Sequence, residues 1–124
     1  MVCILPVDLE KDQERVSQLL SELANREVSV FLKGLSKDTC HLFKVESDGK
    51  ILGVGAVILY QTPVHGWTAR LEDIIITEKH RGGGLGRKLV EHLVAFASSD
   101  DVQANQIVLT SNPQRRAARQ LYTS

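Results

Sequence analysis

The clearest candidate for a functional site in this sequence is the segment between positions 81 and 87. It is rich in glycine and basic residues. Glycines let backbone N–H groups converge without Cβ clashes, and a helix that begins at such a loop adds the positive end of its dipole. Basic side chains add full positive charges beside these groups. The segment therefore predicts a site for a small anion such as a phosphate. Its residues are Arg81, Gly82, Gly83, Gly84, Leu85, Gly86 and Arg87.

The spacing of the glycines excludes two common phosphate-binding loops. A Walker A loop needs a lysine and then Ser or Thr after its last glycine, but Arg87 follows Gly86. The dinucleotide fingerprint needs a further glycine where Arg87 or Leu89 stands. A nucleotide-binding protein is therefore the least favoured hypothesis. The spacing that fits is Arg-x-x-Gly-x-Gly, from Arg81 through Gly84 to Gly86.

The surrounding residues predict the elements that position this loop. A strand over residues 69–77 precedes it, and the run Ile74-Ile75-Ile76 indicates burial on both faces of a sheet. The whole pattern predicts an α/β fold with a mainly antiparallel mixed sheet. The other predicted elements are an edge strand at 2–7, a helix capped by Asp8, a short helix at 28–35, a hairpin of 41–46 and 51–60 around Asp48-Gly49, a long helix after Gly84, a strand at 106–110 and a helix opened by Asn112-Pro113.

The loop and its context resemble the acyl-CoA-binding motif of the GNAT superfamily of N-acetyltransferases. Residues 71–86 are similar to the central strand and pyrophosphate loop of that family, and residues 107–122 to its next strand and helix. The resemblance covers nearly the whole chain, taken as a single domain over 1–124. It implies a GNAT-like mixed, mostly antiparallel central sheet flanked by helices, without the usual last two strands.

The resemblance implies acetyl-CoA as the acyl donor and no metal. The N–H of Ile74 would polarise the thioester carbonyl. The central strand would pair with the pantetheine arm, and the amides of the loop would bind the pyrophosphate. The cofactor-binding residues so implied are Ile74, Ile75, Ile76, Arg81, Gly82, Gly83, Gly84, Leu85, Gly86, Arg87 and Asn112.

Three residues are candidates for the proton transfers of amine acetylation. Tyr122 matches the family tyrosine that protonates the CoA sulfur, although it is also suited to closing a short helix. Glu72 or Asp73 could deprotonate or orient the amine, or both could be ordinary carboxylates at the rim of the sheet. Strand alternation predicts Glu72 on the face of Ile74 and Ile76, with Asp73 on the opposite face.

Composition and charge argue against several other classes of protein. The chain has 124 residues, 15 basic and 15 acidic, so its net charge is zero and a nucleic-acid partner is not expected. No apolar run approaches the roughly 20 residues that span a bilayer, and no signal segment opens the chain, so a cytoplasmic protein without membrane contact is expected. Two cysteines and scattered histidines give no metal-ligand spacing.

The sequence thus predicts an N-acetyltransferase that acts on a primary amine of a small molecule. The alternative is a catalytically silent CoA-binding or assembly module of the same fold. GNAT proteins usually continue after the tyrosine helix with two strands, whereas this sequence stops at Ser124. We therefore expect either a truncated product with weakened activity or a homodimer that shields the strand edge at 106–110. The spacing of residues in the sequence does not identify the acceptor amine. Residues that could contribute to its pocket are Phe31, Tyr60, His65 and Trp67.

Overall fold

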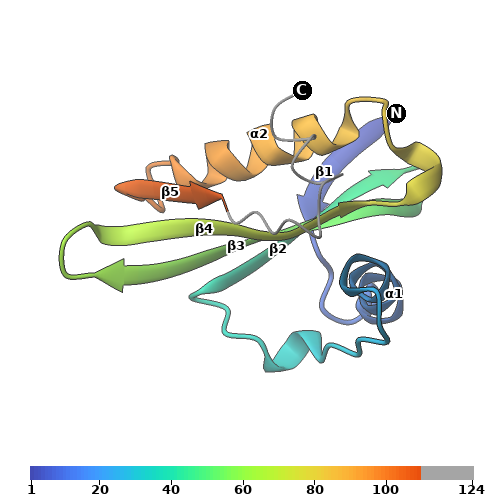
Figure 1. The fold of residues 1–124 in the computed structure, drawn as a ribbon, viewed down its shortest axis with the longest axis horizontal. Coiled ribbons are helices and arrows are strands. Elements are labelled where there is room, and N and C mark those ends of the chain that lie inside the picture. The colour runs from blue at the N-terminus through green and yellow to red at the C-terminus, as the bar shows by residue number, and fades with distance from the viewer. Residues whose placement is uncertain (110–124) are drawn as a thin grey trace.

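Nine short elements make up the part of the chain that the structure, a computed structural model, describes, which is residues 1–109 (Figure 1). Asn112 and Tyr122 lie outside these residues. In chain order the elements are β1 (Val2–Pro6), α1 (Gln13–Ala24), the 3-10 turn η1 (Leu32–Gly34), β2 (Cys40–Ser47), β3 (Lys50–Thr62), β4 (Gly66–Ile76), the 3-10 turn η2 (Glu78–His80), α2 (Leu85–Ala97) and β5 (Gln106–Leu109).

The strands form one sheet in the order β1-β2-β3-β4-β5. The first four strands are antiparallel neighbours, and β5 is parallel to β4 because α2 crosses between them. The predicted mixed, mostly antiparallel α/β fold is therefore confirmed. Among residues 1–109 no helix has the length and the apolar character needed to cross a membrane.

The β2–β3 hairpin turns where the sequence predicts it. Asp48 and Gly49 have φ values of 52° and 77°, the left-handed conformation that a two-residue type I′ turn requires at both positions. The turn joins Ser47 to Lys50, which are register partners. The second strand of this hairpin, β3, pairs with β4 along its other edge.

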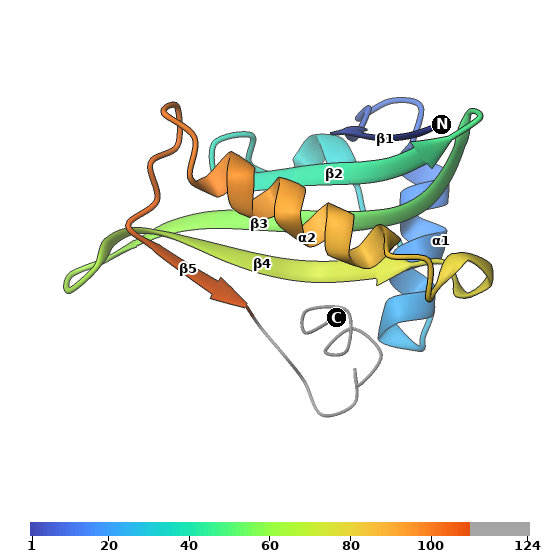
Figure 2. The same ribbon diagram turned by 90° about the horizontal axis from the view of Figure 1, so that it is seen from above.

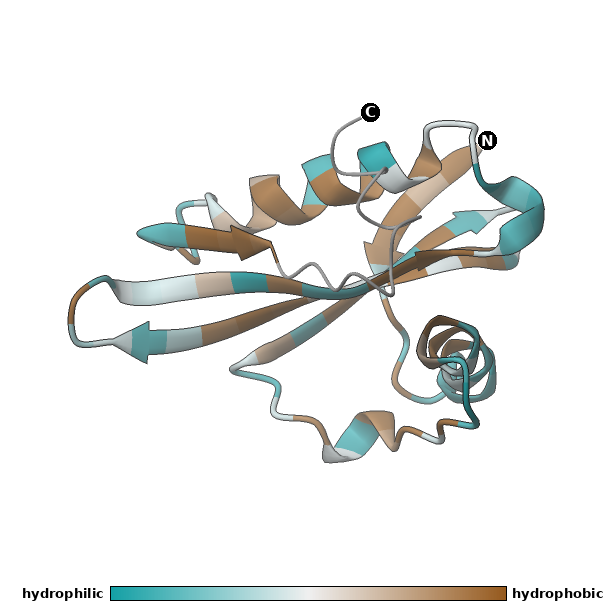
Figure 3. Cartoon of the chain, viewed as in Figure 1, coloured by the Kyte–Doolittle hydropathy of each residue, from teal (hydrophilic) through white to brown (hydrophobic). Residues whose placement is uncertain are grey.

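Each face of the sheet is covered by one helix and carries its own apolar cluster. On one face α2 buries Leu89 and Leu93 against Leu71 of β4, and on the other α1 buries Val16 and Leu19. Figure 1 shows the two helices on opposite sides of the strands. Figure 3 shows the apolar residues concentrated along the middle of the sheet, whereas the loop at Glu78–His80 is hydrophilic. The fold thus fixes β4 from both sides.

Two local predictions in the first forty residues are wrong. The helix predicted after Asp8 begins only at Gln13, because the Asp8 carboxylate accepts hydrogen bonds from the amides of Glu10 and Lys11 and closes a separate turn. These backbone hydrogen bonds lower the pKa of Asp8. The helix predicted over 28–35 is reduced to the single 3-10 turn Leu32–Gly34.

The segment before that 3-10 turn is held extended by side chains of α1. The amide of Val28 donates to the hydroxyl of Ser21 over 2.8 Å, and the amide of Leu32 donates to Oε1 of Gln13, also over 2.8 Å. The chain therefore satisfies these N–H groups without the internal hydrogen bonds of a helix.

A buried ion pair ties the start of α1 to β2. Nζ of Lys44 lies 2.7 Å from Oδ2 of Asp12 and 3.1 Å from Oε2 of Glu46, and the Asp12 and Lys44 side chains are only 10% and 11% exposed. Burial alone would lower the pKa of Lys44, but its hydrogen bonds to both carboxylates outweigh burial and raise it. The contribution of this pair to stability is therefore present below pH 10.5 and is lost as the pH rises through the raised pKa.

Replacing Asp12 with alanine should lower the free energy of unfolding by about 3 kcal/mol, because it leaves a buried ammonium with one carboxylate fewer. Urea unfolding at pH 7 measures this loss. Glu10→Ala is the matched control, since it removes the exposed pair in which Nζ of Lys33 lies 3.3 Å from Oε1 of Glu10. We expect less than about 1 kcal/mol for the control. Equal losses in the two variants would show that the buried pair has no special role.

Candidate active site

The candidate active site lies along β4 beyond the described end of β5. The two strands pair from Thr68 with Gln106 to Leu71 with Leu109. Beyond these pairs β4 continues to Ile76, and among residues 1–109 no strand pairs with the β5-facing edge of its last three residues, from Ile74 to Ile76. Figure 2 shows β5 diverging from β4 toward this end. An unpaired strand edge presents a row of N–H and C=O groups that another extended molecule can use.

A β-bulge sits at the start of this open edge. Val54 of β3 pairs with Ile75 and Ala56 pairs with Glu72, so Asp73 and Ile74 together lie opposite Gly55 alone. Asp73 has a φ of 51°, a conformation that non-glycine residues adopt rarely. The bulge shifts the alternation of side chains by one residue along the rest of the strand.

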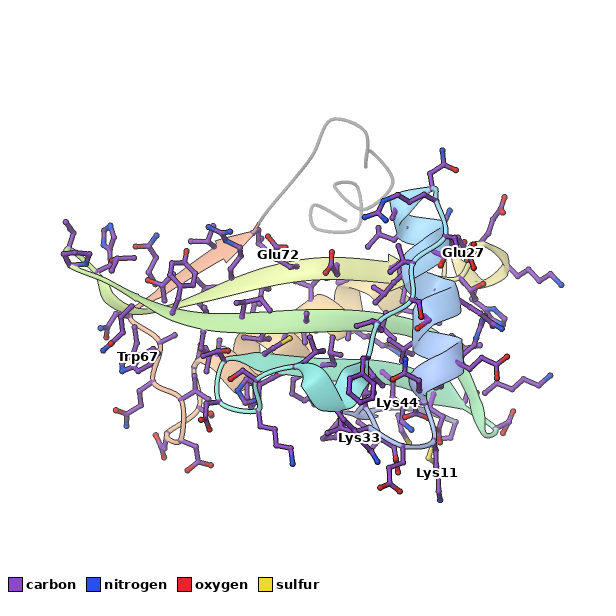
Figure 4. The ribbon with its side chains drawn as sticks, turned by 90° about the horizontal axis from the view of Figure 1, so that it is seen from below. Lys11, Glu27, Lys33, Lys44, Trp67 and Glu72 are labelled. Atoms are coloured by element: carbon purple, nitrogen blue, oxygen red, sulfur yellow. The ribbon has the colours of Figure 1, made fainter. Side chains whose placement is uncertain are left out.

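The bulge overturns the predicted placement of Glu72. Leu71, Ile74 and Ile76 all belong to the apolar cluster under α2, whereas Ile75 belongs to the cluster under α1. The isoleucine run is thus buried on both faces, as predicted. Glu72 alternates with Leu71 and therefore lies on the face opposite Ile74 and Ile76, which is the α1 face. Figure 4, seen from the α1 side, shows its side chain over the middle of β4.

The second carboxylate, Asp73, acts on the thiol of Cys40 in β2. Burial raises the pKa of this thiol, and the negative charge of Asp73 raises it further. The carboxylate of Asp73 is therefore within electrostatic reach of β2. The structure brings both candidate carboxylates to the place where the strands part.

Glu72 has a basic neighbour that the sequence analysis missed. Nη1 of Arg70 lies 3.8 Å from Oε1 of Glu72, and the two residues are on the same face because they are two positions apart on β4 before the bulge. Nη2 of Arg70 lies 3.4 Å from the hydroxyl of Tyr60, and its guanidinium carbon is 5.2 Å from the centre of the Tyr60 ring. Alternation around Glu72 is the signal that could have identified Arg70.

The other aromatic candidates for the acceptor pocket are not brought to Glu72. His65 lies in the β3–β4 turn and Trp67 near the start of β4, and Figure 4 shows Trp67 well separated from Glu72. Phe31 is 69% exposed and precedes η1. Of the four residues, Tyr60 alone has a contact that links it to Glu72, through Arg70.

The predicted anion loop is exposed at the N-terminus of α2, and we call the open space in front of Gly82 and Gly84 the glycine cup. Gly82 and Gly84 each have a φ of 84°, and a Cβ added at either position would meet no atom of residues 1–109 within 4 Å. Gly84 is the N-cap of α2, so the first amides of the helix, from Leu85 on, have no acceptor within the helix. Among the described residues, amides without an acceptor in the helix, open space at two glycines and the positive end of the helix dipole therefore coincide, an arrangement that can bind a diphosphate.

The side chain of Arg81 is turned away from this cup. Its Nε donates to the carbonyl oxygen of Ile76 over 2.8 Å, and its Nη2 donates to Oε1 of Glu22 on α1 over 3.0 Å. Arg81 therefore fastens the loop to the end of β4 and to α1 instead of adding its full charge to the anion site. Arg87 is exposed and its Nε lies 3.3 Å from Oε1 of Glu91 one turn later.

Two glycines of β3 were also missed. A Cβ at Gly55 would lie 3.0 Å from Leu93 and 3.4 Å from Ile74, and a Cβ at Gly53 would lie 2.7 Å from the carbonyl oxygen of Ile75. The two glycines let β4 and α2 approach β3 at the bulge. The signal was available, because glycines two positions apart inside a strand often mark a close backbone approach.

Solved acetyltransferase structures share this fold. No curated protein matches the chain in sequence. A ribosomal-protein-alanine N-acetyltransferase from Brucella melitensis biovar Abortus 2308 is 22% identical, with a TM-score of 0.82 over 98% of this chain and 88% of that one. A predicted acetyltransferase from Clostridium acetobutylicum, solved with acetyl-CoA, is 16% identical, with a TM-score of 0.77 over 100% and 90% of the two chains.

A plant enzyme gives a similar result. Glucosamine-6-phosphate N-acetyltransferase from Arabidopsis thaliana is 18% identical, with a TM-score of 0.72 over 97% of this chain and 88% of that one. At these identities the likeness concerns the fold alone. The acetyltransferase (GNAT) family, however, matches residues 7–124, which is nearly the whole sequence, and the chain therefore belongs to the GNAT family of acetyltransferases.

Proposed function

We propose that this protein transfers an acetyl group from acetyl-CoA to a primary amine of a small molecule by direct attack of the amine on the thioester. The observation that carries the proposal is the continuity between the open edge of β4 and the glycine cup. The edge spans residues 74–76, and the loop of η2 leads from its end to Gly82 and Gly84 at the start of α2. A ligand with an extended amide-bearing arm and a diphosphate can use both.

The backbone of β4 supplies the donors and acceptors for that arm. The N–H of Ile74 is assigned to the thioester oxygen, where a hydrogen bond stabilises the negative charge that develops during attack. The carbonyl oxygen of Ile76 already accepts from Arg81, which leaves its second lone pair for an amide of the pantetheine. The amides of residues 82–86 are assigned to the diphosphate, with Asn112 as a further contact implied by the family resemblance.

The transfer requires two proton movements. The amine nitrogen forms a bond to the acetyl carbon, the carbon–sulfur bond breaks, the nitrogen gives up a proton and the departing thiolate takes one. Glu72 is assigned to the acceptor amine because it lies on the face of β4 opposite the apolar cluster under α2, and Asp73 is adjacent. Tyr122 is assigned to the thiolate, since a phenol is protonated at neutral pH.

Acetyl-CoA-dependent thiol release over a panel of primary amines tests the proposal. We expect CoA thiol to appear in proportion to acetylated amine, with at least one amine giving saturable kinetics. Titration calorimetry with acetyl-CoA is run beside the assay. Binding without thiol release from any amine would instead support a silent CoA-binding module, and absence of binding at hundreds of micromolar would contradict both.

A further inference from the structure

A pair of opposite charges lies beside the point where β4 and β5 part. Arg70 and Glu72 flank Leu71, which forms the last register pair with the described part of β5. Their side chains project to the same face of β4, with 3.8 Å between Nη1 and Oε1. Deprotonation of the amine requires a base such as Glu72 but does not require Arg70. The transfer reaction alone therefore gives Arg70 no role.

The acceptor must reach the split from the face that carries this pair. On the opposite face Ile74 is buried under α2 together with Leu89 and Leu93, and that face is filled with apolar side chains. On the α1 face the side chains of Arg70 and Glu72 are 45% and 28% exposed. α1 packs over the C-terminal end of β4, where Ile75 belongs to its apolar cluster, and Figure 4 shows Glu72 to one side of this helix. An amine that approaches the thioester therefore meets both charges.

The guanidinium of Arg70 is oriented but keeps donors for a ligand. Tyr60 holds it by a contact of 3.4 Å from its hydroxyl and by its ring, 5.2 Å from the guanidinium carbon. The contacts of Arg70 with Tyr60 and Glu72, at 3.4 Å and 3.8 Å, are long for a hydrogen bond and an ion pair. A guanidinium also has five N–H donors. Arg70 can therefore form a bidentate contact with a planar or tetrahedral anion.

We propose that the acceptor is an amine that also carries an anionic group, with its nitrogen at Glu72 and its carboxylate or phosphate on Arg70. This inference rests on the proposed function and names the acceptor class for the same site. A molecule with both charges a few bonds apart complements the pair. An amine without the anion gains only the contact with Glu72, and a polyamine also meets repulsion from the guanidinium.

Matched pairs of amines test this inference. Phosphoethanolamine is compared with ethanolamine, and β-alanine with propylamine, by the ratio of kcat/KM within each pair. We expect the anionic member to be favoured about tenfold or more, mostly through KM, since an ion pair with one arginine is worth about 1.4 kcal/mol or more. The two pairs also distinguish a phosphate from a carboxylate as the preferred anion.

Variants of Arg70 separate anion recognition from a role in positioning Glu72. Arg70→Gln should bring the ratio in each pair close to one, and Arg70→Glu should shift preference toward a diamine such as putrescine. Arg70→Lys should restore part of the preference. Arg26→Gln, at the exposed end of α1, is the control and should keep the wild-type ratios. If Arg70 only positions Glu72, Arg70→Gln will lower kcat/KM for both members of a pair equally and the ratio will not move.

The outcomes distinguish this inference from the proposed function. If the wild-type protein acetylates ethanolamine and propylamine as efficiently as their anionic partners, the inference is wrong and the transferase proposal stands. If acetyl-CoA binds but no amine of any charge releases thiol, the proposed function fails and the inference falls with it.

Discussion

Replacing Gly84 with valine is expected to weaken acetyl-CoA binding about a hundredfold or more, equivalent to about 2.8 kcal/mol. Gly84 has a φ of 84°, and within the described part of the chain no atom lies within 4 Å of a Cβ added there. In our account a diphosphate fills that space. A branched side chain would occupy the cup, and it would also oppose the left-handed conformation that lets α2 begin here. Titration calorimetry with acetyl-CoA and with CoA measures the loss.

Gly49→Val is the matched control for backbone strain. Gly49 has a φ of 77° and likewise no atom within 4 Å of an added Cβ, but it lies in the β2–β3 turn. Both variants should lose stability by about 1–2 kcal/mol in urea unfolding. We expect Gly49→Val to retain acetyl-CoA affinity. Equal loss of affinity in the two variants would mean that strain alone, and not the filled cup, explains the effect at Gly84.

Replacing Tyr122 with phenylalanine is expected to lower kcat by about a hundredfold or more while acetyl-CoA affinity stays within a factor of about two. The phenol is assigned to the departing thiolate, so its loss affects a step that follows binding. Steady-state thiol release gives kcat, and calorimetry on the same preparation gives the affinity. A parallel fall in kcat, in affinity and in the free energy of unfolding would indicate a tyrosine that supports the structure.

Short sequence patterns predicted the turn, the buried strand and the glycine loop that position the site. Asp48-Gly49 specified its turn because only a few residues tolerate two successive left-handed conformations. The isoleucine triplet predicted burial on both faces, and the glycines at 82 and 84 adopt the positive φ that a converging amide loop needs. Each of these features depends on a backbone preference or on a pattern a few residues long.

The features that the sequence did not predict depend on contacts between distant segments. The bulge at Asp73 follows from the register with β3 and moves Glu72 to the other face. The side chain of Arg81 donates hydrogen bonds to the carbonyl oxygen of Ile76 and to Glu22, which is 59 positions away in the sequence. The extended chain before η1 is held by serine and glutamine side chains of α1. Alternation and spacing cannot predict such pairings.

Chemical-shift mapping of backbone amides during titration with CoA locates the bound CoA on the chain. The account predicts saturable shifts for the amides of Gly82, Gly83, Gly84 and Leu85, where the diphosphate is assigned, and for Ile74, beside the thiol end of the arm. The amide of Gly66, in the β3–β4 turn at the opposite end of the sheet, should not move. Saturable binding that shifts other amides and leaves both the glycine cup and the edge of β4 unchanged would contradict the account.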